Sequence, residues 1–138
     1  GRRMNDSMGE YVASQVVKLM IKKEIVLHEA QLLLLGVTFK ENCPDIRNSK
    51  VIDIYNELKQ YGIEVDVHDP HAIKEEVHEE FGIALVNDLS KKYNAVVLAV
   101  SHNEYKSFDI ESLLVSKEDA VLFDTKAFLD RSIVDGRL

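Results

Sequence analysis

The sequence predicts an α/β fold in which helices cover both faces of an open parallel sheet. Two observations carry this prediction. Short apolar segments of strand length recur along the chain, and each is followed by a longer segment whose apolar residues repeat with helical period. Strands that alternate with helices at this spacing form parallel sheets through right-handed crossovers. The 138 residues have room for one such domain.

A helix is expected before the sheet begins, from about Asp6 to Lys22, with Asn5, Asp6 or Ser7 able to cap its start. Its apolar residues recur at helical spacing on one face: Met8, Val12, Val16 and Met20. The sheet does not need this helix. We therefore expect the apolar face to be exposed on an isolated domain and to require a partner surface.

The elements of the sheet follow in regular order. Strands are expected over residues 30–37, 63–67, 83–86, 94–100 and 120–123. Helices or helical turns are expected from Ser49 until Gly62 ends the first of them, and then over 72–80, 88–92 and 107–114. The segments 30–37 and 94–100 are apolar almost throughout, as is typical of strands buried on both faces. The predicted architecture is a three-layer, Rossmann-like open parallel sheet preceded by an N-terminal helix.

Composition argues against several classes of function. The net charge is -7 and the basic residues are scattered, so the sequence does not favour nucleic acid as a partner. The apolar runs are too short to cross a membrane and no signal peptide opens the chain, so we expect a cytoplasmic protein. Cys43 is the only cysteine, which rules out an internal disulfide and a cysteine-based metal cluster.

The loop after the first predicted strand holds the most informative residues. In open parallel sheets, ligands bind beyond the carboxyl ends of the strands. A dinucleotide site would need a G-x-G-x-x-G turn here, and residues 36–48 contain none. They contain Phe39 as a stacking surface, Lys40 as a point charge for phosphate, and Arg47 as a planar fork for two hydrogen bonds. Considered by spacing alone, both basic residues also suit a solvated surface.

At this loop the sequence resembles a known family. The segments 36–40 (GVTFK) and 45–49 (DIRNS) closely resemble the opening of the C-terminal domain of the UDP-glucose/GDP-mannose dehydrogenase family. Residues 1–8 (GRRMNDSM) are similar to that family's central dimerisation helix, and 67–70 (VHDP) and 123–126 (FDTK) to two further segments. Segment 40–48 looks most like the UDP-N-acetylglucosamine and UDP-N-acetylgalactosamine 6-dehydrogenases of polysaccharide biosynthesis.

The resemblance implies a function for the loop residues. Enzymes of this family oxidise the C6 alcohol of a UDP-sugar to a carboxylate in two NAD-dependent steps, through a thiohemiacetal on a cysteine. Phe39, Lys40 and Lys126 would bind the UDP-sugar, and Arg47 would reach the NAD that the absent N-terminal domain mainly holds. Relatives often have arginine where Lys126 stands, and a lysine does not reproduce a bidentate grip.

The resemblance also implies that the chain is one part of an enzyme. Residues 1–24 would be the end of the central dimerisation helix, through which the protein forms a homodimer, and 25–138 the UDP-sugar-binding C-terminal domain. The family's cysteine lies in a G-G-x-C-x-P-K-D motif that this sequence does not contain. Cys43 lies outside that motif, so we predict no catalytic residue here and an inactive fragment.

Two further interpretations stay open at this stage. A stand-alone flavodoxin-like regulatory module would need paired acidic residues after the first strand, and there are none. An interaction module would account for the apolar face of the first helix. His68, Asp69 and His71 cluster at a strand end, where a structural turn suits them better than a metal site. His102 and Glu104 follow another buried strand, either as a plain loop or as substrate contacts.

Overall fold

The computed structural model describes the backbone of residues 2–138 and the side chains of residues 8–138. The family-like segment 1–8 therefore lies mostly outside the described side chains, and so do the candidate capping residues Asn5, Asp6 and Ser7. The chain opens with the long helix α1 (Arg2–Lys22), which begins a turn earlier than the sequence pattern predicted. A single 3-10 turn, η1 (Leu27–Glu29), then leads into the sheet.

The predicted parallel sheet is confirmed. Its strands are β1 (Gln31–Leu35), β2 (Glu64–His68), β3 (Ala95–Leu98), β4 (Val121–Asp124) and β5 (Gly136–Arg137). They lie in the order β2-β1-β3-β4-β5, and every neighbouring pair is parallel. Leu34 is in register with Val67 on one side and with Val97 on the other. The final strand, β5, is too short to give a periodic signal in the sequence.

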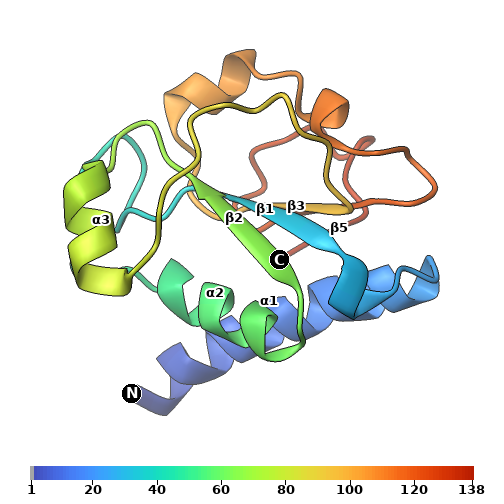
Figure 1. Ribbon diagram of the computed structural model, residues 1–138, viewed down its shortest axis with the longest axis horizontal. Coiled ribbons are helices and arrows are strands. Elements are labelled where there is room, and N and C mark those ends of the chain that lie inside the picture. Colours follow the sequence, from blue (N-terminus) through green and yellow to red (C-terminus); the bar gives the residue numbers. More distant parts are fainter. Residues whose placement is uncertain (1) are drawn as a thin grey trace.

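Each face of the sheet has its own hydrophobic cluster, because successive side chains of a strand point to opposite faces. Leu32 and Leu34 of β1 belong to the cluster beneath α1 and α2 (Val51–Gln60). Leu33 and Leu35 belong to the opposite cluster, beside η2 (Asn103–Ser107) and η3 (Ile110–Leu113). Figure 1 shows α1 and α2 side by side along one face, with α3 (Lys74–Phe81) at the edge near β2.

The packing of α1 corrects one prediction. Val12, Val16 and Met20 are at most 1% exposed, because they pack into the same core as α2 and the sheet. This face of α1 is therefore covered by the chain itself and is not available for self-association. Among its described side chains, α1 leaves three large apolar ones exposed: Met8, at the N-terminal end of this face, and Tyr11 and Ile21, which lie off it. Helix α1, which the predicted sheet does not require, covers part of one face of the sheet.

The middle of the chain holds the other departures from prediction. Residues 83–86 form no strand, although the Val86 N–H donates to the Val67 carbonyl of the edge strand β2 at 2.8 Å. Residues 88–92 form no helical turn, and the helix expected over 107–114 is replaced by the short η2 and η3.

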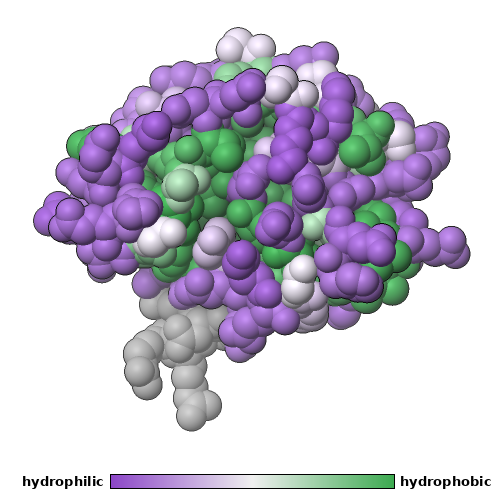
Figure 2. Space-filling view, viewed as in Figure 1, coloured by the Kyte–Doolittle hydropathy of each residue, from purple (hydrophilic) through white to green (hydrophobic). Residues whose placement is uncertain are grey.

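Figure 2 shows the surface from the same side as Figure 1. This face is mostly hydrophilic, with hydrophobic surface in recesses between hydrophilic ridges. Within residues 2–138, no helix combines the length and apolar character needed to cross a membrane.

Candidate functional site

The order of the strands places the candidate site. The chain leaves β1 for β2 on one side and later returns to β3 on the other side, so the strand order reverses between β1 and β3. Ligands of open parallel sheets bind beyond the carboxyl ends of the strands at such a point. The loops that meet there are 36–50 after β1, 69–73 after β2 and 99–102 after β3.

Gly36 allows the loops after β1 and β3 to touch. Its φ of +97° lies in the region that side chains disfavour. A Cβ on Gly36 would lie 2.5 Å from the Val100 Cβ and 2.9 Å from the Val100 nitrogen. Both the turn and the close approach therefore require glycine at this position, which is the first residue of the family-like loop.

Asp69 joins the loop after β2 to the loop after β1. Its Oδ2 accepts hydrogen bonds from the backbone N–H groups of Val37 at 2.7 Å and Thr38 at 3.2 Å. Its Oδ1 accepts from those of His71 at 2.8 Å and Ala72 at 2.9 Å. Burial raises the pKa of the Asp69 carboxyl, but hydrogen bonds from His102 and the backbone outweigh burial and hold the pKa below its usual range. Asp69 therefore stabilises a structural turn, in which both of its carboxylate oxygens accept hydrogen bonds.

His102 extends this network to the third loop. Its side chain is fully buried, and its Nε2 lies 3.0 Å from Asp69 Oδ2. The backbone N–H of Asn42 donates to His102 Nδ1 at 2.9 Å. In return, Asn42 Oδ1 accepts from the backbone N–H of Asn103 at 2.8 Å. The residues after β1, β2 and β3 are thus connected through one imidazole, a role that the sequence did not indicate.

His68 and Tyr105 form a second polar contact beside this network. The Tyr105 hydroxyl donates to the His68 carbonyl at 3.0 Å and lies 3.0 Å from His68 Nδ1. Burial lowers the pKa of His68 despite the nearby Asp69 carboxylate, and burial raises the pKa of Tyr105. Both side chains are therefore neutral in the folded protein at neutral pH. At the rim, His71 Nε2 lies 2.8 Å from Glu104 Oε1.

The predicted substrate-binding residues lie at the carboxyl edge of the sheet. Phe39 and Lys40 are exposed, although the adjoining Thr38 is fully buried. Lys126 is exposed on the turn after β4. That turn is fixed by the buried Asp124, whose carboxylate accepts from the N–H groups of Lys126, Phe128 and Leu129 at 2.7–2.8 Å. The fold thus brings these three residues to one edge from β1 and β4, with β3 between.

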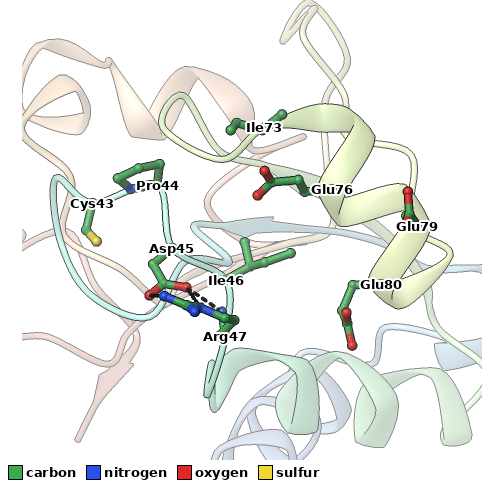
Figure 3. Close-up of a pocket in the computed structure, with 9 residues that line it drawn as sticks. All are labelled: Cys43, Pro44, Asp45, Ile46, Arg47, Ile73, Glu76, Glu79 and Glu80. Carbon is green, nitrogen blue, oxygen red and sulfur yellow. Dashed lines mark hydrogen bonds and ion pairs between the residues drawn. The ribbon is translucent and has the colours of Figure 1, made fainter.

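Arg47 lies farther along the same loop. Its Nε and Nη2 donate to the two carboxylate oxygens of Asp45, each at 3.0 Å, while its side chain stays 85% exposed. The hydrogen bonds from Arg47 lower the pKa of Asp45. Figure 3 shows this pair facing α3 across a hollow of about 580 Å³ that Cys43 also lines. Glu76, Glu79 and Glu80 line the opposite side of the hollow and make that side acidic.

Comparison with known proteins agrees with this geometry. A family model described as "UDP-glucose/GDP-mannose dehydrogenase family, UDP binding domain" matches residues 33–131, which is most of the chain. The chain belongs to this family. Membership favours a UDP-binding domain over a stand-alone flavodoxin-like regulator.

Individual relatives place the chain more closely within the UDP-glucose/GDP-mannose dehydrogenase family. It is 48% identical over 140 aligned residues to UDP-N-acetyl-D-glucosamine 6-dehydrogenase of Pseudomonas aeruginosa, covering 100% of the chain and 33% of that protein. The enzyme of the same name from Salmonella typhi is 45% identical, also over 33% of its length. The structure of the chain matches that of UDP-N-acetyl-mannosamine dehydrogenase Cap5O from Staphylococcus aureus with a TM-score of 0.73 at 30% identity. The match covers 99% of the chain and 32% of that protein. The chain spans about a third of these dehydrogenases.

The sequence pointed to the exposed residues of the site and to the structural turn at Asp69, which the structure confirms, and it missed how His102 and Asn42 hold the loop. Asp69 precedes a proline directly after a strand, a pattern typical of a side chain that accepts hydrogen bonds from the following backbone. This pattern agrees with the structural turn predicted at Asp69. Asn42 has a φ of +60°, which asparagine tolerates better than most residues, but nothing in the sequence connects it with His102, which is sixty positions away.

Proposed function

We propose that the edge formed by the ends of β1, β3 and β4 binds the UDP part of a UDP-sugar. Lys40 would meet the diphosphate as a point charge, Phe39 would offer an apolar surface, and Lys126 would add a second cation from the other side of β3. One observation carries the proposal: in a UDP-binding domain of this family, Phe39 and Lys40 are exposed on a loop whose buried residues are fixed by Asp69 and His102.

For the complete enzyme we propose oxidation of the C6 alcohol of a UDP-N-acetylhexosamine or UDP-hexose to the uronic acid, in polysaccharide biosynthesis. NAD would accept the hydride. The described residues fit only a peripheral role toward NAD, because residues 36–48 lack a glycine fingerprint. Arg47 fits that role. Asp45 occupies its Nε and one Nη2 proton, so Nη1 remains for a phosphate oxygen.

The partners of this chain would be the N-terminal and central domains of the enzyme and a second copy. Residues 1–24 would belong to the central helix and 25–138 to the UDP-sugar domain. Because Val12, Val16 and Met20 are buried in the chain's own core, a homodimer through α1 would use the other side of the helix. The exposed Tyr11 and Ile21 support that assignment.

The test of the proposed site is titration calorimetry on the 138-residue chain with UDP, UDP-N-acetylglucosamine and NAD. We expect binding of UDP and of the UDP-sugar without binding of NAD. Lys40→Ala should weaken UDP binding about tenfold to a hundredfold, because a hydrogen bond to a charged group is lost. Arg47→Ala and the matched control Lys59→Ala, whose lysine lies in the last turn of α2, should leave the affinity for UDP unchanged.

The division of labour between the two basic residues is wrong if Arg47→Ala weakens UDP binding as much as Lys40→Ala does. The loop is then a single anion site. The chain should also produce no NADH from NAD and a UDP-sugar, since it lacks the family's cysteine motif. Measurable NADH formation by the pure chain would contradict that expectation.

A further inference from the structure

We propose that His102 is a positioning residue for the UDP site: its imidazole holds the 38–42 segment in the conformation that presents Phe39 and Lys40. The inference rests on the proposed function of those two residues. It extends that function by assigning a role to a buried side chain that does not itself contact the ligand.

The contacts of His102 select one state of the ring. Asp69 is ionised at neutral pH and its Oδ2 only accepts hydrogen bonds, so Nε2 at 3.0 Å carries a proton. The Asn42 backbone N–H only donates, so Nδ1 at 2.9 Å carries none. The neutral tautomer protonated at Nε2 satisfies both contacts. Thr38 Oγ1, which donates to the Lys40 carbonyl at 3.0 Å, lies 3.2 Å from the same Nε2 and accepts from it.

These contacts attach the segment at both ends. Thr38 is fixed at the start by Asp69 and by Nε2 of the imidazole, and Asn42 is fixed at the end by Nδ1. Phe39 and Lys40 lie between the two attachments and are exposed. Two other rings confine the imidazole: the tilted His71 ring lies 4.5 Å away between centroids, and the Tyr105 ring 5.7 Å away.

A ligand that binds this segment therefore meets a surface already in place. Ordering a mobile loop on binding costs affinity, and a loop ordered beforehand avoids that cost. The Nδ1 contact is the one that matters for Lys40, because the Asp69 end keeps four backbone hydrogen bonds without the imidazole. Loss of the acceptor at Nδ1 removes the hydrogen bond from the Asn42 N–H, so the imidazole no longer holds that end of the 38–42 segment.

Two conservative variants separate the ring nitrogens. The glutamine side chain of the His102→Gln variant can place an amide N–H near the Nε2 position, so it keeps a donor to Asp69 and loses the acceptor for Asn42. The asparagine side chain of the His102→Asn variant can place its carbonyl oxygen near the Nδ1 position, so it keeps the acceptor and loses the donor. We expect His102→Gln to weaken UDP binding by about tenfold and His102→Asn by no more than about threefold, the range of one net hydrogen bond.

The matched control is His28→Gln, the same substitution at a histidine outside this network, whose side chain is 79% exposed. It should bind UDP within about twofold of wild type. All titrations use temperatures at which circular dichroism shows each variant fully folded. A purely structural imidazole would change the unfolding midpoint and leave the affinity of the folded molecules equal in both His102 variants, which would overturn the proposal.

A spectroscopic measurement tests the positioning role of His102 even if a variant fails to fold. Nitrogen chemical shifts of the His102 ring in the wild-type chain should show protonation at Nε2 alone, with and without UDP. Protonation at Nδ1 would overturn the proposal. The Lys40→Ala titration distinguishes the two failures. If Lys40→Ala loses affinity while both His102 variants bind like wild type, only this inference fails; if wild type binds no UDP, the proposed function fails and this inference with it.

Discussion

The loop between β1 and α2 has two halves that are held in different ways. Residues 37–42 are tied to the ends of β2 and β3 through the buried carboxylate of Asp69 and the buried imidazole of His102. Residues 43–48 are anchored by Ile46 in the core. Among the described residues, however, the guanidinium of Arg47 is held only by Asp45, a neighbour in the same loop, in an exposed ion pair.

The difference indicates which half is complete within this chain. A buried network with every polar group engaged sets one geometry at considerable cost to any other. An exposed ion pair contributes little, and solvent competes for both partners. We infer that the UDP side of the crevice is built by this domain alone. On the proposed function, Asp45 would only pre-orient Arg47, and the domain that holds NAD would complete its orientation.

The largest effect is expected at Gly36, where the loops after β1 and β3 touch. Gly36→Ala combines a strained φ of +97° with a Cβ only 2.5 Å from that of Val100, so it should lower the free energy of unfolding by about 3 kcal/mol or more. Urea unfolding measures it. Gly82→Ala is the control, since Gly82 has a φ of +71° but no atom within 4 Å of the added Cβ. It should cost only about 1 kcal/mol, and equal losses would contradict the close approach.

Asp69→Asn should have the next largest effect. It weakens hydrogen bonds from four backbone groups and from His102, so we expect a loss of about 2–3 kcal/mol in the free energy of unfolding. The pKa of Asp69 is lower in the folded state, so its contribution is present above the unfolded pKa of about 3.9 and disappears as pH falls through the folded pKa. Urea midpoints of wild type and variant should therefore converge below about pH 4, and a constant difference would count against the assignment.

His68 should give a smaller effect that depends on pH. Burial lowers its pKa, so below the unfolded pKa of about 6.5 the unfolded chain takes up a proton that the folded chain resists. Stability should fall as pH decreases from about 6.5. His68→Asn should make that fall shallower in urea midpoints measured between about pH 7 and pH 5. His28→Asn, at an exposed histidine, is the control and should leave the slope unchanged.

The smallest effect is expected in the outer half of the loop. Asp45→Asn removes the ion pair with Arg47, which is largely exposed, so urea midpoints should not change and UDP binding to the chain should stay the same. In the complete enzyme proposed above, the variant should raise the Michaelis constant for NAD by about twofold to fivefold, because Arg47 loses the contact that pre-orients it. A loss of UDP affinity would show instead that both halves of the loop form one site.

The sequence predicted the framework well where a segment's burial can be seen in its own composition. The runs that became β1 and β3 are apolar apart from Gln31 at the start of β1, and Gly62 ends α2 as expected. The exposed residues Phe39, Lys40 and Arg47 stood out because they follow such a run. Residues 83–86 were predicted to form a strand on the same principle. They contact the edge strand β2 through one bond at Val86 and form no ladder, and composition cannot foresee that outcome.

The sequence by itself determined the order of elements, the parallel sheet and the edge where the loops meet, because each depends on local periodicity and on the fixed handedness of crossovers. Only the tertiary structure decided two things. It buried Val12, Val16 and Met20 within the chain's own core, and it placed His102 between Asp69 and Asn42. An amphipathic helix reveals that it needs a cover without revealing which one, and a histidine reveals its chemistry without its partners. Residues far apart in the chain supply both, and only the packing of the whole domain brings them together.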